Sequence, residues 1–506
     1  MKFNMKIFNR NKVTNFEGAE AYALTPKMEL YSAVAATSLN DTFYEKGNER
    51  LERIRSLVAK NDAAFVAKLA VYAREKMYLR SVPLALAVEL AKAKSGEADV
   101  SKTVARVVQR ADEITELLAY YQFANNRKGM KKLNKLSKQV QKGLAVAFNK
   151  FDEYQFAKYN RDAEVKLRDA LFLVHPKAKD EAQQVLFNKI AKDELKVAET
   201  WESKLSAAGQ ASFEDETEKL NAKKEAWEEM IMSQKMGYMA MLRNLRNILE
   251  AKVSEQAIEK VCNYIGNAGA VAKSKQFPFR FVSAYRELKA VNSGYTSRVM
   301  DALEDAAAAS AANIAGYDSN TRVVVAVDFS GSMQSAVSAK STCQKYEVGL
   351  ILAMLLKSRC KNVVTGIFGE DYKIISVPSK NILANVDLFR CRVGEVGHST
   401  NGYKVIEDLI ARNEVVDKVM VFTDMQLYNS NGSYGKTIAS EWKKYKAIAP
   451  NAKIYLFDLA GYGNSPLRVE GNDVFMIAGW SDKVFEVLNA IENGSNAVAE
   501  IDKIEL

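Results

Sequence analysis

The chain has 506 residues, of which 26% are charged, and its net charge is +10. It contains no run of about 18 uninterrupted apolar residues, which excludes a membrane-spanning helix, and its basic N-terminus lacks an apolar signal core. Four scattered cysteines without a C-x-x-C pair argue against a disulfide framework or a zinc site. We therefore expect a soluble cytoplasmic protein, with no membrane partner and about two to four domains.

Helical periodicity dominates the chain from Pro26 to about residue 315, after an extended polar segment at 1–20. Apolar residues recur three and four positions apart in Leu51–Val58 and Phe65–Ala73. Further helices are predicted at 101–124, 131–149, 163–174, 180–206, 214–232, 236–250, 254–265 and 302–315. Successive amphipathic helices of this length predict an α-solenoid of HEAT type, although no strict repeat is present. The charged stretch 193–229 is typical of a solvated outer face.

A different pattern begins after the turn residues Gly316–Asn320. Short apolar strands alternate with helices, which predicts a doubly wound, mainly parallel sheet. The strands are predicted at 323–327, 363–368, 418–422, 453–459 and 473–477, and the helices near 345–358, 402–412, 436–447 and 481–492. We expect two domains, an α-helical repeat domain at 1–318 and an α/β domain at 319–506.

The excess of positive over negative charge lies entirely in the helical part of the sequence. From Arg322 onward, 21 Lys and Arg residues balance 21 Asp and Glu residues, so the first 321 residues carry the whole excess. Between Leu117 and Phe151 no acidic residue occurs, although eight basic residues do. This asymmetry indicates that the helical part binds a polyanion.

The strand Arg322–Asp328 ends in the sequence Asp328-Phe-Ser330-Gly-Ser332. Open α/β sheets place their sites at the carboxyl ends of strands. An aspartate and two serines at alternate positions can direct three oxygens to one point, which suits a hard divalent cation such as Mg²⁺. The D-x-S-x-S spacing resembles the metal-ion-dependent adhesion site of von Willebrand factor A domains.

Several stretches together resemble one family, the Ro autoantigens with their TROVE module. Met236–Asn247 resembles the family's L-L-R-N-L-G-x-M helix, and Gln276–Tyr285 resembles its H-P-F-x-x-x-x-A-x-x-x-Y segment. Asn15–Ala23 and Val82–Leu90 resemble N-terminal pieces of the family, and the D-x-S-x-S segment follows in the expected order. The chain is identified as a bacterial or phage-type member, with a patchy match in 185–235.

The resemblance implies a fold and a function. In the family, helical repeats close into a monomeric ring that is bridged by a von Willebrand A domain. The hole takes single-stranded 3′ ends of misfolded noncoding RNAs, and the basic outer surface binds Y RNAs. An exoribonuclease is a possible partner of such a complex.

The family's metal ligands carry over to five positions of this chain. Asp328, Ser330 and Ser332 match the first loop, Thr400 falls where the family has G-G-T-D, and Asp424 matches the aspartate of F-T-D-N-E. His398-Ser399 replaces the glycine pair and Asn401 replaces the second loop's aspartate. The alternative is that Ser330 and Ser332 only cap the following turn.

The family's RNA-binding positions carry over to the helical part. Lys166–Lys177 resembles the K-D-L-L-R-L-S-H-x-K segment, which assigns a Y RNA contact to His175, and Lys158 and Arg161 resemble the residues that act with it. The full predicted set is Arg127, Lys128, Lys131, Lys132, Lys135, Lys138, Lys158, Arg161, Arg168, His175 and Lys177. The alternatives are an ordinary solvated face for the basic run and a structural role for the histidine.

Two smaller groups of residues have open roles. Tyr120, Tyr121 and Phe123 are expected in the core rather than against RNA bases. Arg243 and Arg246 either contact RNA or brace neighbouring helices.

Three classes of function were compared. We expect a non-enzymatic RNA-binding protein, and the alternative is a protein-interaction scaffold whose bound Mg²⁺ takes a partner's carboxylate. A hydrolase is disfavoured because a Ser-His-Asp arrangement around Ser330 would depend on His398, and no G-x-S-x-G elbow is present. A Walker A loop is also missing.

Overall fold

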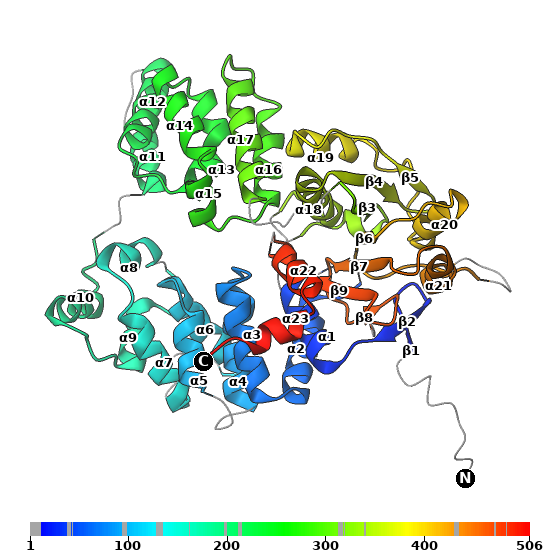
Figure 1. The fold of residues 1–506 in the computed structure, drawn as a ribbon. Helices are drawn as coiled ribbons and strands as arrows, with labels where there is room; N and C mark the ends of the chain where they lie inside the picture. Colours follow the sequence, from blue (N-terminus) through cyan, green and yellow to red (C-terminus); the bar gives the residue numbers. More distant parts are fainter. Residues whose placement is uncertain are drawn as a thin grey trace, which may run out of the picture. The chain divides into compact units, whose positions relative to one another are not determined.

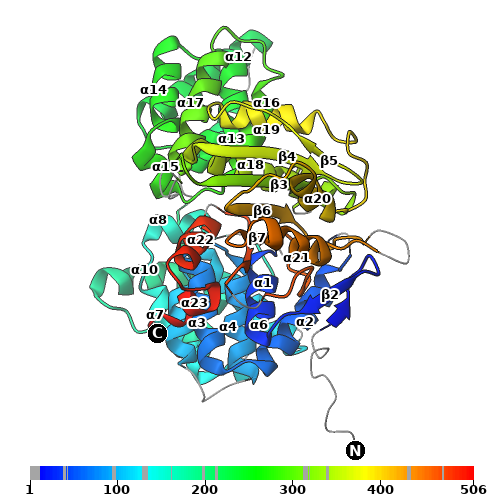
Figure 2. The same ribbon diagram turned by 45° about the vertical axis from the view of Figure 1, so that its right-hand side comes forward.

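The computed structural model describes residues 12–37, 42, 44–93, 99–127, 135–160, 162–196, 200–210, 215–311, 317, 319–337, 341–429, 435–469, 472–481 and 483–506 (Figures 1 and 2). The chain divides into two compact units. The first unit comprises residues 1–50 and 212–497, and the second unit comprises residues 51–211 and 498–506. The predicted division into 1–318 and 319–506 follows the order of helical and α/β segments along the chain, and the compact units group those segments differently.

The second unit is helical throughout its described residues. Its helices are α3 (Ala63–Glu75), α4 (Ser81–Ala93), α5 (Val100–Val107), α6 (Asp112–Ala124), α7 (Lys138–Phe148), α8 (Glu153–Tyr159), α9 (Leu167–Val174), α10 (Glu181–Lys192) and α11 (Trp201–Gln210), together with most of α23 (Ala497–Asp502), and α2 (Gly47–Lys60) leads into it. Pairs such as α3 with α4, α4 with α6, and α5 with α7 pack against each other. Apolar residues at helical spacing, such as Phe65, Leu69 and Val104, are fully buried between them. The prediction of stacked amphipathic helices is confirmed for this unit.

Two predicted long helices are in fact interrupted. The segment 101–124 forms α5 and α6, separated at Val108–Ala111. The carboxylate of Glu113, which is fully buried, accepts hydrogen bonds from the backbone N–H groups of Gln109 (2.8 Å) and Arg110 (3.1 Å) and pairs with Arg74 at 2.8 Å. This buried ion pair stabilises the turn, which hydrophobic spacing alone cannot predict.

The second interruption lies in the segment predicted as one helix at 180–206. Its helix α10 ends at Asp193, whose φ of 61° lies in the left-handed region that terminates helices.

The sheet of the first unit has the order β5-β4-β3-β6-β7-β9. Its strands are β3 (Arg322–Asp328), β4 (Asn362–Phe368), β5 (Tyr372–Ile374), β6 (Lys418–Thr423), β7 (Lys453–Asp458) and β9 (Val474–Ala478). All neighbouring pairs are parallel except β4 and β5, which are antiparallel. The predicted strands and the doubly wound order are confirmed, and the short edge strand β5 was not predicted.

Alternating side chains of β3 face two helical layers. Val324 and Ala326 join the core formed with α20 (Tyr403–Ala411) and α21 (Ile438–Ile448). On the other face, α18 (Lys345–Arg359) packs so closely that a Cβ on Gly349 would lie 3.1 Å from Cγ1 of Val327. The helices α22 (Val484–Glu492) and α1 (Pro26–Ala35) pack on β9. Both faces are therefore covered, as parallel sheets require.

The later part of the predicted helical domain packs against helices of the α/β part. It contains α12 (Glu216–Met232), α13 (Tyr238–Glu250), α14 (Glu255–Ile265), α15 (Ala268–Ser274), α16 (Phe279–Leu288) and α17 (Thr296–Ser310). Helix α16 contacts α18, and both α16 and α17 contact α19 (Ile382–Arg390). Arg286 of α16 forms an ion pair with Glu347 of α18, which is 1% exposed. These contacts explain why residues 215–311 belong to the first unit.

The described part of the N-terminal segment is folded against the sheet. Strands β1 (Lys12–Thr14) and β2 (Glu20–Ala23) form a three-stranded antiparallel sheet with β8 (Asn464–Ser465). The hydroxyl of Tyr31 donates a hydrogen bond to the carbonyl of Ala478 (3.0 Å). The prediction of an extended polar segment at 1–20 missed this hairpin. Within the described ranges, no helix is long and apolar enough to cross a membrane.

Candidate metal site and basic surface residues

The predicted metal ligands lie at the carboxyl edge of the sheet. Asp328 is the last residue of β3, and Asp424 directly follows the neighbouring strand β6. The chain leaves β3 toward β4 on one side and returns to β6 on the other, so this edge is the topological switch point of the sheet. Ligand sites of doubly wound sheets form at such points.

Asp328 is completely buried, and its carboxylate accepts hydrogen bonds from its own loop and from the neighbouring strand. It accepts one from the backbone N–H of Ser330 (2.9 Å) and one from the hydroxyl of Thr423 (2.6 Å). The hydroxyl oxygens of Ser330 and Ser332 lie 3.3 Å apart. Burial, and then the charge of Asp424, raise the pKa of Asp328 to about 7.

Backbone contacts bring the second and third loops to the same edge. The N–H of Gly331 donates to the carbonyl of His398 (3.0 Å), and the buried Thr400 hydroxyl donates to the carbonyl of Gln426 (2.8 Å). The N–H of Gln426 in turn donates to Asp424 (3.1 Å). We call the set Asp328, Ser330, Ser332, Thr400 and Asp424 the candidate metal site.

Asp424 provides the observation that tests whether these residues fit a cation. It is completely buried, and its Oδ2 atom has no well-formed hydrogen bond in the described part of the chain. Burial raises its pKa, while Lys345 and the nearby Ser332 hydroxyl act in the opposite direction. Two buried carboxylates, one with an unsatisfied oxygen, and three hydroxyls form an all-oxygen set that fits Mg²⁺. This set would hold the cation and supply a charged coordination position at the sheet edge.

The site does not depend on histidine or cysteine. The described residues contain no group of three or more His, Cys, Asp and Glu side chains that could hold a metal. The exposed ring of His398 lies 3.1 Å from the side-chain nitrogen of Gln334. Asn401, which stands in place of an aspartate, donates to the carbonyl of Glu370 (2.9 Å).

Sequence reasoning missed the groups that surround this edge. Lys345 is 2% exposed, and its ammonium group donates to the hydroxyl of Tyr462 (3.2 Å). Burial lowers the pKa of Lys345 to about 8, against the attraction of Asp424 and Asp458. Asp458 is also fully buried and accepts a hydrogen bond from Ser32 (2.5 Å). Their positions in separate segments gave no local signal, although the alternation of strands placed Asp458 at the end of a strand.

The predicted RNA-binding residues that the structure describes lie in the second unit, on or beside α6 to α9. Lys135, Lys138, Lys158, Arg168, His175 and Lys177 are exposed, and Arg127 is half-buried. We call these seven the basic surface residues. Lys128, Lys131, Lys132 and Arg161 lie outside the described residues. The exposure of the seven is compatible with phosphate contact and equally with a solvated face.

The loop that carries His175 and Lys177 is fixed against α7. The side-chain amide of Gln141 donates to the carbonyls of Leu173 (3.3 Å) and Val174 (3.2 Å), and Asn149 donates to the carbonyl of Lys177 (2.8 Å). His175 itself has a φ of 49°, in the left-handed region, and ends α9. The loop therefore holds its exposed side chains on a constrained backbone.

Two basic surface residues lie over exposed aromatic rings. The guanidinium of Arg168 is 5.8 Å from the ring centre of Phe172, and the ammonium of Lys158 is 5.7 Å from that of Tyr154. Phe172 is 51% exposed and Tyr154 is 49% exposed, so both rings present apolar area to solvent. Exposed aromatic rings beside cations are suited to stacking with unpaired bases.

The core expectation for the aromatic cluster before the basic run is right for one residue and wrong for another. Tyr121 is buried, but Phe123 is 60% exposed and lies under the guanidinium of Arg55 at 5.5 Å. Tyr120 donates a hydrogen bond to Glu89 (2.6 Å). In the first unit, Arg246 pairs with Glu287 of α16 at 2.7 Å, which supports a bracing role.

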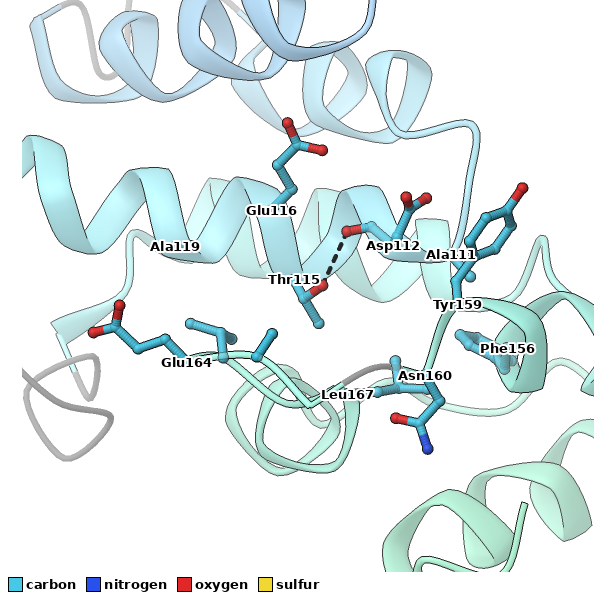
Figure 3. A pocket seen from close by; sticks show the side chains of 12 residues that line it. Ala111, Asp112, Thr115, Glu116, Ala119, Phe156, Tyr159, Asn160, Glu164 and Leu167 are labelled. Atoms are coloured by element: carbon cyan, nitrogen blue, oxygen red, sulfur yellow. Dashed lines mark hydrogen bonds between the residues drawn. The ribbon is translucent and has the colours of Figure 1, made fainter. Parts of the chain in front are cut away.

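A cavity of about 240 Å³ lies between α6, α8 and the start of α9 (Figure 3). Its lining includes the acidic residues Asp112, Glu116 and Glu164. The Asp112 carboxylate forms ion pairs with Arg80 (3.2 Å) and Arg110 (2.9 Å), which compensate its charge.

The fold and the site together define a class of protein, in which helical repeats precede a doubly wound domain with an oxygen-rich loop site. The TROVE domain matches residues 25–212 and 192–323, which is more than half of the chain. The chain belongs to the TROVE domain family, as the resemblance to the Ro autoantigens predicted.

Two curated relatives and one solved structure are similar to parts or all of the chain. It is 38% identical over 91 residues to telomerase protein component 1 of Mus musculus and 37% identical over 94 residues to that of Rattus norvegicus. These matches cover 18% and 19% of this chain and only 3% of either relative.

The crystal structure of the Ro (RSR) protein of Deinococcus radiodurans matches with a TM-score of 0.59 at 17% identity. That match covers 93% of this chain and 100% of that chain, and it shows a shared fold.

Proposed function

We propose that this protein is a non-enzymatic, RNA-binding component of a ribonucleoprotein. The observation that carries the proposal is the set of exposed cations on α7 to α9, two of which, Lys158 and Arg168, lie over exposed aromatic rings. Cations attract phosphates in a salt-dependent manner, and exposed rings stack with unpaired bases. Membership of the TROVE domain family supports the same reading.

The finer proposal follows from the Ro resemblance. Y-like RNAs bind the basic surface residues, with His175 among the contacts, and single-stranded 3′ ends of misfolded RNAs enter the hole of a monomeric ring. The protein would then serve RNA quality control or processing in the cytoplasm, together with an exoribonuclease.

Filter retention across a salt series tests RNA binding. Structured RNAs with and without single-stranded 3′ tails are compared between about 50 and 200 mM salt. The variant Arg168→Glu with Lys177→Glu should show a slope of log affinity against log salt that is shallower by about 2. The matched control, Lys361→Glu with Lys380→Glu, reverses two exposed charges of the α/β part and should bind like the wild type. The proposal would be refuted if RNA binding were weak, equal for RNAs with and without the 3′ tail, and equal for the wild type and the Arg168/Lys177 variant.

A metal-dependent protein-interaction scaffold is the second candidate function. The unsatisfied, buried Oδ2 atom of Asp424 supports it, because a divalent cation would compensate the two buried carboxylates. Mg²⁺ should raise the thermal unfolding temperature of the wild type. It should leave that of Asp328→Ala unchanged, and an identical response of both proteins would exclude this site.

A further inference from the structure

Residues of the N-terminal segment contact the loop that carries Asp424, one of the residues of the candidate metal site. The side-chain amide of Asn15, which is 6% exposed, donates to the carbonyl of Leu427 (2.8 Å). The next residue, Phe16, donates its backbone N–H to the side-chain oxygen of Gln426 (2.9 Å). Both contacts are made to the loop that carries Asp424. Residues far apart in sequence are thereby joined at the edge of the sheet.

Tyr44 extends this cover toward the serines of the site. Its ring stacks on Phe16 with ring centres 5.2 Å apart and meets the edge of Tyr462 at 5.5 Å. Its hydroxyl donates a short hydrogen bond to the carboxylate of Glu17. The three rings hold this hydroxyl in place, because Phe16 also contacts Tyr462 at 5.4 Å.

The N–H of Gln426, whose side chain bonds Phe16, donates to Asp424 (3.1 Å), and the electrostatics of this edge agree with that proximity. Burial and then the hydrogen bond to Glu17 raise the pKa of Tyr44, to which Asp424 adds, whereas a hydrogen bond with the Ser332 hydroxyl lowers it. The charge of Glu17 likewise contributes to the raised pKa of Asp424, although burial is the main cause. A polar chain thus runs from Ser332 through Tyr44 to Glu17.

We propose that Glu17 and Tyr44 form a built-in cap that excludes an external carboxylate from the candidate metal site. An adhesion-type site binds its partner by offering an open coordination position to the partner's carboxylate. Here the chain's own carboxylate and phenol are joined by a hydrogen bond, and the neighbouring Asn15 and Phe16 bind the loop that carries Asp424. With this cap, a bound cation would link the N-terminal segment to the α/β part and would not bind a partner's carboxylate. The inference rests on the candidate metal site but not on RNA binding, and it opposes the scaffold function, because a capped cation offers no position to a partner's carboxylate.

Water-proton relaxation of the full-length protein loaded with Mn²⁺ tests the cap, with acetate as the probe carboxylate. In the wild type, the relaxation should respond to acetate only weakly, because the cap blocks its access to the ion. In Tyr44→Ala and in Glu17→Gln, acetate should displace bound water at concentrations at least about tenfold lower. Glu17→Gln preserves shape, so it keeps the test valid if Tyr44→Ala does not fold. Glu20→Gln is the matched control, since Glu20 lies on the same hairpin but pairs with the exposed Lys12.

Three results would overturn the cap. The wild type could respond to acetate as strongly as the variants, the variants could remain as insensitive as the wild type, or the wild type could bind no Mn²⁺. The last result would also remove the scaffold function. None of the three results bears on the proposed RNA binding, which the filter-retention experiment tests separately.

Discussion

The two regions singled out by this sequence use charge in opposite ways. The candidate metal site buries Asp328 and Asp424 completely, so each charge there depends on a few neighbouring atoms. The basic surface residues, such as Arg168 and Lys177, stay exposed, so their proposed contacts with phosphate would depend mainly on their number and position. Buried charges interact strongly and are sensitive to single substitutions, whereas exposed charges are screened by salt and contribute in small increments. We therefore expect a single substitution to abolish cation binding at the candidate metal site, whereas each substitution among the basic surface residues should weaken RNA binding only slightly.

The largest effect is expected for Asp328→Ala. This substitution removes a buried carboxylate that accepts hydrogen bonds from the Ser330 N–H and the Thr423 hydroxyl, so affinity for Mn²⁺ should fall by more than about 100-fold. RNA affinity should remain largely intact, because the charge excess lies outside the α/β part. Isothermal titration with Mn²⁺ and filter retention with RNA measure the two quantities on the same preparation. A large loss of RNA affinity in this variant would show that the two regions do not act independently.

The pH dependence of the metal-free protein is the next largest effect. Burial and Asp424 raise the pKa of Asp328 to about 7, so the folded protein keeps a proton that the unfolded chain releases from about pH 4 upward. The free energy of unfolding should therefore fall as pH rises between about 4 and 7, by at most about 1.4 kcal/mol per pH unit. Urea unfolding in EDTA measures it, and Asp328→Asn should flatten the dependence. Equal slopes in both proteins would contradict the assignment.

Ser32→Ala tests the buried network beside the site. The Ser32 hydroxyl donates to the buried carboxylate of Asp458 at 2.5 Å, and its loss should cost about 1.5 to 3 kcal/mol of unfolding free energy. Ser274→Ala is the control, since its half-buried hydroxyl only bonds the carbonyl of Val271 within its own helix. Equal urea midpoints for the two variants would show that the Asp458 contact contributes little.

The smallest effect is expected for Lys177→Ala on the basic surface. If Lys177 contacts one phosphate, the salt slope of RNA binding should become shallower by about 1, with a uniform loss across RNA sequences. The global stability should not change, because the side chain is exposed. An unchanged slope would assign Lys177 to a solvated face.

Much of the fold was predictable because local patterns decide it. The β-branched run before Asp328 and its repetition every few dozen residues gave the five parallel strands, because buried parallel strands need continuous apolar side chains. Helical spacing gave most helices, but not the break at Val108–Ala111, which depends on Glu113 and Arg74 meeting in the folded unit.

The sequence by itself indicated the D-x-S-x-S segment of the candidate metal site, because it directly follows a recognisable buried strand, and the resemblance to the Ro family added Thr400 and Asp424. Only the tertiary structure decided what surrounds them. Four of the surrounding residues come from separate segments of the chain, and no local spacing relates them. Two lie near the N-terminus, Glu17 and Tyr44, and two lie in the α/β part, Lys345 and Asp458. The exposure of Phe123 likewise depends on which helices pack against α6. Local chemistry names the ligands, but long-range packing decides whether anything else can reach them.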